Sequence, residues 1–316
     1  MLTPIVIGTI MYASMLVLLC IGFTFTHMIE KFPNFAHTSY ASIGTLFAYN
    51  FVRLWGYNPY AAWPFAALLG GFFGVALYVL IVLPMQKIGT SGIHITFAMF
   101  ALTYVINAVL AVFSYWVMIK YGFRTGRFML KTYDFTFNGL PGILFMAPVT
   151  SIALVTLLHL FLTRSKFGVA IRATIEDPEL ASGLGVNTFR VHIASWFLTG
   201  AIAGLAGAAL PLWQPTSLSG SDQLMMSVIA GSVLGGLDNI YGAIVGGVAF
   251  AYAQRILPGV LIRAFGIWIA GYEPLVPVLV ITIVLWLEPR GITGTIDGSA
   301  GRAGRLGRAI RRLLGS

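Results

Sequence analysis

Long apolar segments alternate with short polar connections along this chain. Six segments reach the roughly 17–25 residues that a helix needs to cross a bilayer: 5–26, 62–84, 92–113, 141–163, 190–211 and 271–288. Three others, at 34–54, 223–236 and 239–257, are shorter, interrupted or rich in small residues. The pattern predicts an all-α polytopic membrane protein with roughly eight to ten transmembrane helices, about nine as the central value, some of them discontinuous.

Composition excludes a soluble domain. Charged residues make up 9% of the 316 residues, against roughly 25% in soluble domains, and the mean hydropathy is +0.88. The first residues, MLTPIVIGTIM, have no basic group before the apolar run, which predicts a first transmembrane helix rather than a removable signal peptide. Cys20 is the only cysteine, so neither a disulfide framework nor a cysteine-based metal site is expected.

The distribution of Lys and Arg predicts the orientation. Placing 164–190 and the C-terminal tail in the cytoplasm leaves twelve of the 19 basic residues inside and seven outside. The basic stretch 114–140 then lies outside, as does 212–222. We divide the chain into a transmembrane domain, 1–294, and a basic amphipathic cytoplasmic tail, 295–316. Because the tail follows so many apolar segments, its arginines favour anionic membrane lipids over nucleic acid.

The stretch RSKFGVAIRATIEDPELASGLGV, residues 164–186, is a polar island between apolar segments. It predicts a short helix from Val169 to Glu176 and a second one from Glu179 to Gly183, which Pro178 initiates and Gly183 and Gly185 end. From the residues alone, two interpretations are equally open: a docking element for a soluble partner, or a solvated connector. The charges gathered there are Arg164, Lys166, Arg172, Glu176, Asp177 and Glu179.

The chemistry of the predicted spans points to transport without catalysis. No Asp, Glu, Lys or Arg is expected away from the ends of a span, which argues against ion coupling through an intramembrane charge. Asp238, in a glycine-rich turn, is interpreted as a turn residue. The sequence has neither histidine pairs at metal-ligand spacing nor a nucleophile elbow. It also lacks a phosphate-binding loop, so we expect no metal or cofactor, and ATP would have to be bound by another chain.

Glycines recur at helix-packing spacing. Pairs separated by three residues allow two helix backbones to approach closely, and packing is the favoured interpretation. Between 223 and 247 the glycines are denser, and GGLDNIYG joins two short apolar segments. Such a discontinuous element is tolerated at membrane depth only where it is buried or lines a cavity. The pairs are Gly70/Gly74, Gly200/Gly204, Gly231/Gly235 and Gly242/Gly246.

Three stretches carry a family resemblance. The first stretch, residues 12–49, contains NFAH at 34–37. The third stretch consists of GAIAGLAGAAL followed by SVIAGSVLGGLDNIYGAIVGG. The motif LEPRGITG ends the last apolar segment of the chain. Together, over about residues 5–294 and in their order along the chain, the stretches resemble the LivH-like permease subunit of branched-chain amino acid ABC transporters. Thr38 stands at a position where this family usually has glycine. The second stretch matches R-A-x-x-E-D-x-x-x-A-x-x-x-G through Arg172, Ala173, Glu176, Asp177, Ala181 and Gly185.

The resemblance implies a permease subunit of an ATP-driven importer in a prokaryotic plasma membrane. The loop 164–189 would dock an ATP-binding subunit, and 114–140 and 212–222 would receive an extracytoplasmic substrate-binding protein. The path would lie against a second, LivM-like permease subunit or a second copy. Gln214 and Asn239 have packing or turn roles as equal alternatives. The implied path residues are Asn34, His37, Gly44, Gln214, Gly235, Gly236 and Asn239.

Three other functions compete with the importer. A stand-alone ion-coupled secondary transporter of a small polar solute is weakened by the uncharged spans and by the charged loop. A membrane-embedded enzyme is disfavoured because no catalytic set of residues converges, and a passive channel because no filter-like repeat is present. The substrate stays open, because importers of urea, short-chain amides and other amino acids share these motifs. The stretch 114–140 and the tail also depart from the family pattern.

Overall fold

A computed structural model describes residues 4–123, 125–217, 220–267, 271, 275–287 and 291–292. The predicted all-α architecture is confirmed, with four two-residue strands in addition. The helices are α1 (Pro4–Glu30), α2 (His37–Trp55), α3 (Ala62–Leu77), α4 (Leu83–Lys87), α5 (Gly92–Tyr121), α6 (Ile143–Arg164), α7 (Lys166–Glu176), α8 (Pro178–Gly183), α9 (Thr188–Ala209), α10 (Gly220–Gly235), α11 (Ile240–Phe265) and α12 (Leu275–Leu287). The strands are β1 (Arg127–Phe128), β2 (Thr136–Phe137), β3 (Leu140–Pro141) and β4 (Thr216–Ser217).

Within the described residues, 6 helical stretches are long and apolar enough to cross a membrane. Five correspond to predicted spans, and the protein is a multi-pass membrane protein. The π-helical turn Tyr78–Val82 continues α3 into α4, so that one span runs from Pro59 to Lys87. The other stretches are Val6–Glu30, Gly92–Tyr121, Ile143–Arg164, Thr188–Leu212 and Ile240–Ala264. The helices α2, α10 and α12 are shorter or less apolar, and the total of eight to ten spans stays a prediction.

Two predicted boundaries were wrong. Residues 114–121 belong to α5, because their apolar side chains continue the helix until Gly122 ends it at a φ of 73°. The segment predicted as 239–257 is the 26-residue helix α11. The predicted end at residue 257 lies just before Pro258, but a membrane helix tolerates an internal proline, and α11 continues past Pro258 to Phe265.

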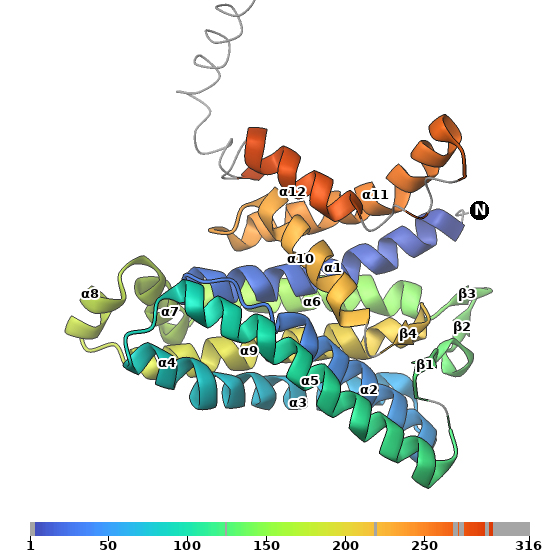
Figure 1. Ribbon diagram of the computed structural model, residues 1–316, viewed down its shortest axis with the longest axis horizontal. Coiled ribbons are helices and arrows are strands. Elements are labelled where there is room, and N and C mark those ends of the chain that lie inside the picture. Colours follow the sequence, from blue (N-terminus) through green and yellow to red (C-terminus); the bar gives the residue numbers. More distant parts are fainter. Residues whose placement is uncertain are drawn as a thin grey trace, which may run out of the picture.

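The two ends of the bundle differ in kind (Figure 1). At one end lie α7, α8 and α4; at the other lie the four strands. There β1 pairs antiparallel with β4, and Leu130 N donates to Pro211 O over 2.6 Å. The stretches 114–140 and 212–222, both predicted to face outward, therefore meet at the same end. The predicted C-terminal tail, residues 295–316, lies outside the described residues.

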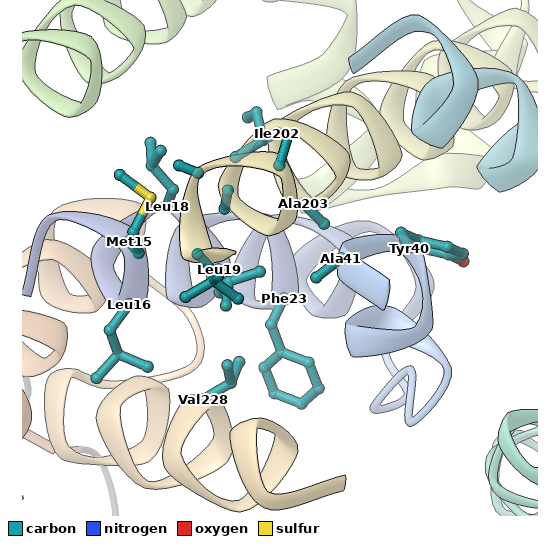
Figure 2. Close-up of a cluster of buried hydrophobic side chains, with 14 of the residues drawn as sticks. Met15, Leu16, Leu18, Leu19, Phe23, Tyr40, Ala41, Ile202, Ala203 and Val228 are labelled. Atoms are coloured by element: carbon teal, nitrogen blue, oxygen red, sulfur yellow. The ribbon is translucent and has the colours of Figure 1, made fainter. Parts of the chain in front are cut away.

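Helix α1 forms the centre of the core. Its buried side chains pack against α9 on one side and against α10 on another, with α2 beyond its C-terminal half (Figure 2). Leu19 and Phe23 are each 1% exposed, and they lie beside Ala203 of α9 and Val228 of α10. A helix that is apolar on all of its faces is expected where other helices surround it in a membrane bundle.

Glycines bring α9 into backbone contact with two neighbouring helices. A Cβ atom on Gly70 of α3 would overlap the carbonyl of Gly200, and one on Gly204 would lie 2.5 Å from the carbonyl of Ala66. On the side of α2, a Cβ on Gly44 would overlap the carbonyl of Gly204. The structure thus uses the predicted Gly70/Gly74 and Gly200/Gly204 pairs for packing, and it places Gly44 in the same contact.

We predict that Gly204→Val destabilises the bundle by about 3 kcal/mol or more, because the added side chain must force α9 away from α3. Thermal unfolding of the purified protein in detergent measures this effect. Gly259→Val on α11 is the matched control, since a Cβ there meets nothing within 4 Å. Equal melting temperatures for the two variants would contradict the packing role of Gly204.

Candidate functional site

A polar cavity of about 390 Å³ opens near the strand end of the bundle. Side chains from α1, α2, α10 and α11 line it, together with β1 and the segment that leads from α9 to β4. Of the predicted path residues, Gln214 lies here. The lining residues are Tyr12, Ala41, Ser42, Thr45, Arg127, Leu210, Gln214, Pro215, Thr216, Ser217, Leu224, Ser227, Gln254 and Arg255.

Arg255 of α11 is the charged centre of this cavity wall. Its guanidinium lies 4.7 Å from the centroid of the Tyr12 ring and donates to Gln214 Oε1 over 3.4 Å. The Tyr12 hydroxyl donates to Gln254 Oε1 over 2.7 Å. These contacts connect α1, α11 and the segment after α9. The expectation that no charge lies away from the end of a span was wrong for Arg255, because α11 continues well beyond it.

Two predicted path residues, Asn34 and His37, close the buried corner between α1 and α2. Asn34 Nδ2 donates to the Tyr40 hydroxyl over 3.1 Å, and its Oδ1 accepts from Ala36 N over 3.1 Å. His37 Nε2 lies 3.0 Å from Leu19 O. Both side chains are fully buried, and neither lines the polar cavity. In this structure they stabilise the non-helical segment between α1 and α2.

The glycine-rich hairpin joins α10 to α11 through a turn. Gly236 has a φ of 108°, and Asn239 Oδ1 accepts from Tyr241 N over 2.9 Å, which caps α11. A Cβ on Gly235 would overlap the carbonyl of Gly242. Asp238 lies exposed in the turn, as predicted. The predicted path residues Gly235, Gly236 and Asn239 thus serve packing, turn and capping in this structure.

The polar island folds as predicted, with α7 beginning three residues before the expected Val169. Ser165 Oγ accepts from Gly168 N over 2.8 Å to cap α7, and Asp177 Oδ1 accepts from Glu179 N and Leu180 N, over 3.0 and 2.9 Å, to cap α8. Gly185 has a φ of 88°, a conformation that favours glycine. These local bonds cap the two helices of the island, and the buried Ile171 and Thr174 pack α7 onto the bundle.

The surface of the island mixes charge with exposed apolar groups. Leu180 is 62% exposed and Leu184 is 77% exposed, whereas Ala181 is buried. The predicted docking residues Arg172, Glu176 and Asp177 are exposed, and Ala173 is half-buried. Arg172 also lines a second cavity, of about 230 Å³, together with Asp238 and Asn239. The island and the turn of the α10–α11 hairpin therefore lie side by side.

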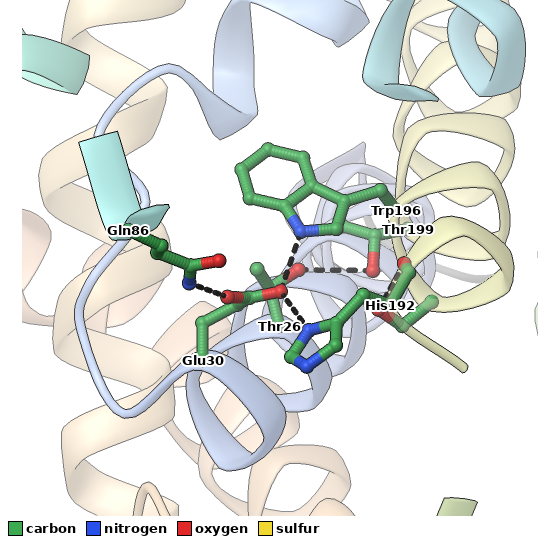
Figure 3. A network of polar contacts seen from close by, with 7 residues as sticks. Thr26, Glu30, Gln86, His192, Trp196 and Thr199 are labelled. Carbon is green, nitrogen blue, oxygen red and sulfur yellow. Dashed lines mark hydrogen bonds and ion pairs between the residues drawn. The ribbon is translucent and has the colours of Figure 1, made fainter. Parts of the chain in front are cut away.

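A buried carboxylate near the island was missed by the sequence analysis. The Glu30 side chain, at the end of α1, is 0% exposed. Its Oε1 accepts from His192 Nδ1 and from Trp196 Nε1, each over 2.7 Å, and its Oε2 accepts from Gln86 Nε2 over 2.9 Å (Figure 3). The Tyr78 ring stacks on His192 with centroids 5.5 Å apart. The sequence placed Glu30 in a loop, and a carboxylate there gave no signal of burial.

This network ties α1 and α4 to the first turns of α9, directly after the island. Thr26 of α1 adds a hydrogen bond to Thr199 of α9 over 2.9 Å. Glu30 thus connects the ends of α1, α4 and α9 that lie next to the island α7–α8. Among the described residues, no group of three or more His, Cys, Asp or Glu side chains could hold a metal ion.

The geometry can be set beside known proteins. The profile of the family described as the permease component of the branched-chain amino acid transport system matches residues 5–285. The chain belongs to this permease family. It is 33% identical, over 287 residues and 91% of each chain, to a protein of Methanocaldococcus jannaschii named as a probable branched-chain amino acid transport permease protein LivH. The family comprises transport subunits and not enzymes.

Bacterial relatives match about half of the permease. The Salmonella typhimurium high-affinity branched-chain amino acid transport system permease protein LivH is 31% identical over 147 residues, 46% of this chain and 45% of its own. The corresponding protein BraD of Pseudomonas aeruginosa is 30% identical over 140 residues, 43% of each. No solved structure matches the chain.

We predict that Glu30→Ala destabilises the permease by about 3–5 kcal/mol, because the half-buried His192 and the buried Trp196 lose their hydrogen-bond acceptor. Thermal unfolding in detergent is the measurement. Glu179→Ala, which removes an exposed carboxylate of α8, is the control and should leave the melting temperature within the range of surface substitutions. A Glu30→Ala protein as stable as this control would show that the network is not required.

Proposed function

We propose that this permease is the membrane-spanning subunit of an ATP-driven importer for branched-chain amino acids in a prokaryotic plasma membrane. The observation that carries the proposal is the island α7–α8, a capped and exposed element at the end of the bundle opposite the strands. Family membership and the printed names of the relatives support the permease role and the substrate class. The sequence contains no phosphate-binding loop, so ATP would be hydrolysed by a partner.

In this proposal the island docks an ATP-binding subunit. Leu180 and Leu184 offer apolar contacts, and Arg172 and Glu176 lie exposed nearby to set the register. Gly185 maintains the turn after α8. Movement of the docked subunit would reach α9 at once, because α9 begins at Thr188, and Glu30 would transmit it to α1.

The opposite end would receive the substrate-binding protein. The short strands β1 and β4 hold the stretches 122–142 and 210–217 together beside the polar cavity. The second permease subunit, LivM-like or another copy of this chain, would complete the path. The arginines of residues 295–316 would contact anionic lipids on the cytoplasmic face.

We predict that replacing both Leu180 and Leu184 with Glu abolishes capture of the ATP-binding subunit. The two side chains are mostly exposed, so the change removes a docking surface without opening the core. The measurement is co-purification of the tagged permease from its native membrane in mild detergent, followed by mass spectrometry of its partners.

The matched control replaces the same two leucines with Met, which keeps the surface apolar and should retain the partner. An unchanged amount of ATP-binding subunit with the Glu variant would exclude docking through this face. Purification of the wild-type chain with no ATP-binding subunit would contradict the proposed function itself.

A further inference from the structure

We propose that Arg255 binds the carboxylate of the transported amino acid inside the polar cavity. The inference rests on the proposed function and deepens it, because it assigns a binding site within the permease and the chemical group that the site recognises. The ligand class is a small zwitterion with a free carboxylate and an apolar side chain. Four features of the cavity support this assignment.

The first feature is the depth of the charge. Arg255 lies 15 residues after Ile240 and 10 residues before Phe265 in one continuous helix. At about 1.5 Å per residue, it stands about 15 Å from the nearer helix end. A charge at such a position is costly and marks a pathway or a ligand site, unless a protein group compensates it.

The second feature is the lack of a compensating carboxylate. No described carboxylate pairs with Arg255, and the described residues that line the cavity include no Asp or Glu. A guanidinium has five N–H donors. Within the described part of the chain, Arg255 uses one of them, toward Gln214 Oε1 at 3.4 Å. The remaining donors can form the bidentate pair that guanidinium makes with a carboxylate.

The third feature is the way the guanidinium is held. The Tyr12 ring lies against it at 4.7 Å, and the Tyr12 hydroxyl is itself fixed by Gln254. This stacking orients the planar group without neutralising its charge. Arg127, exposed on β1 at the same cavity, adds a second positive charge near the strand end. An anionic group entering from that end would be attracted toward Arg255.

The fourth feature is the mixture of surfaces in the cavity. Its volume of about 390 Å³ falls within the range of small-molecule sites, about 300–1,000 Å³. Ser42 contributes polar wall, and Leu210 and Leu224 contribute apolar wall. A branched-chain amino acid needs both kinds of surface. A lipid phosphate shares the anionic chemistry, so the experiment separates the two sources.

The test measures binding of radiolabelled L-leucine to the permease complex, purified from its membrane and placed in nanodiscs of neutral phosphatidylcholine. L-Leucinamide, which keeps the ammonium group and lacks the carboxylate, is the competing probe. We expect it to compete at least about tenfold more weakly than L-leucine, because it cannot form the charge-assisted pair. Arg255→Gln should weaken L-leucine binding by at least about tenfold and abolish this discrimination.

Two further variants make the result specific. Arg255→Lys keeps the charge but loses the bidentate geometry, and we expect an intermediate affinity. Arg263→Gln removes an exposed arginine from the same helix that does not line the cavity, and it should bind like the wild type. If Arg255→Gln fails to fold, the wild-type discrimination between L-leucine and L-leucinamide and the Arg255→Lys affinity still decide the matter.

Several results would overturn the inference. These are wild-type affinity in Arg255→Gln, equal competition by L-leucinamide, or no saturable L-leucine binding by the wild-type complex. Co-purification of phosphatidylglycerol with the wild-type complex and its loss from Arg255→Gln, without any effect on L-leucine binding, would assign the cavity to lipid instead. The proposed function is judged separately, by capture of the ATP-binding subunit through α7–α8, so the two can fail independently.

Discussion

Direct backbone contact between α9 and its neighbours α2 and α3 is the constraint on which the rest of this structure depends. Within a bilayer, apolar side chains gain nothing by leaving lipid for protein, so helix association depends on close packing and polar contacts. The glycines at 70, 200 and 204 supply this packing, because each lies where a side chain would meet the backbone of the facing helix. The position of α9 in turn sets both functional ends of the bundle.

Two charged side chains have different surroundings, one beside the island and the other within the bundle at the polar cavity. Glu30 is completely buried and accepts three hydrogen bonds, which suits a fixed structural joint. Arg255 is partly exposed in a cavity, and its only hydrogen-bond partner among the described residues is a neutral amide. The first joins the helices around the base of the island α7–α8. The second leaves a positive charge available to a ligand.

The sequence was most informative where local chemistry decides the structure. The apolar segments predicted most of the long helices, and Pro178 and Gly185 predicted where the second helix of the island begins and ends, which the structure confirms. It was misleading where tertiary context prevails. The helix α11 continues through Pro258 to Phe265, whereas the predicted segment ended at residue 257, which placed Arg255 among its terminal residues.

The candidate site was only partly accessible to sequence reasoning for a similar reason. Gln214 was named, but its hydrogen-bond partner Arg255 lies about 40 residues away along the chain. Tyr12, which contacts Arg255, lies more than 200 residues away from both, and no local pattern links the three. Asn34 and His37 form a recognisable motif whose contacts are structural. Glu30 looked like an ordinary loop carboxylate, because only the folded arrangement brings Gln86, His192 and Trp196 around it.

The most direct test of the central claim is uptake of radiolabelled L-leucine into proteoliposomes that contain the complete permease complex. The account predicts uptake that requires ATP together with the substrate-binding protein and that is indifferent to proton and sodium gradients. Uptake by the permease alone, driven by an ion gradient and unaffected by ATP, would contradict it and identify a secondary transporter.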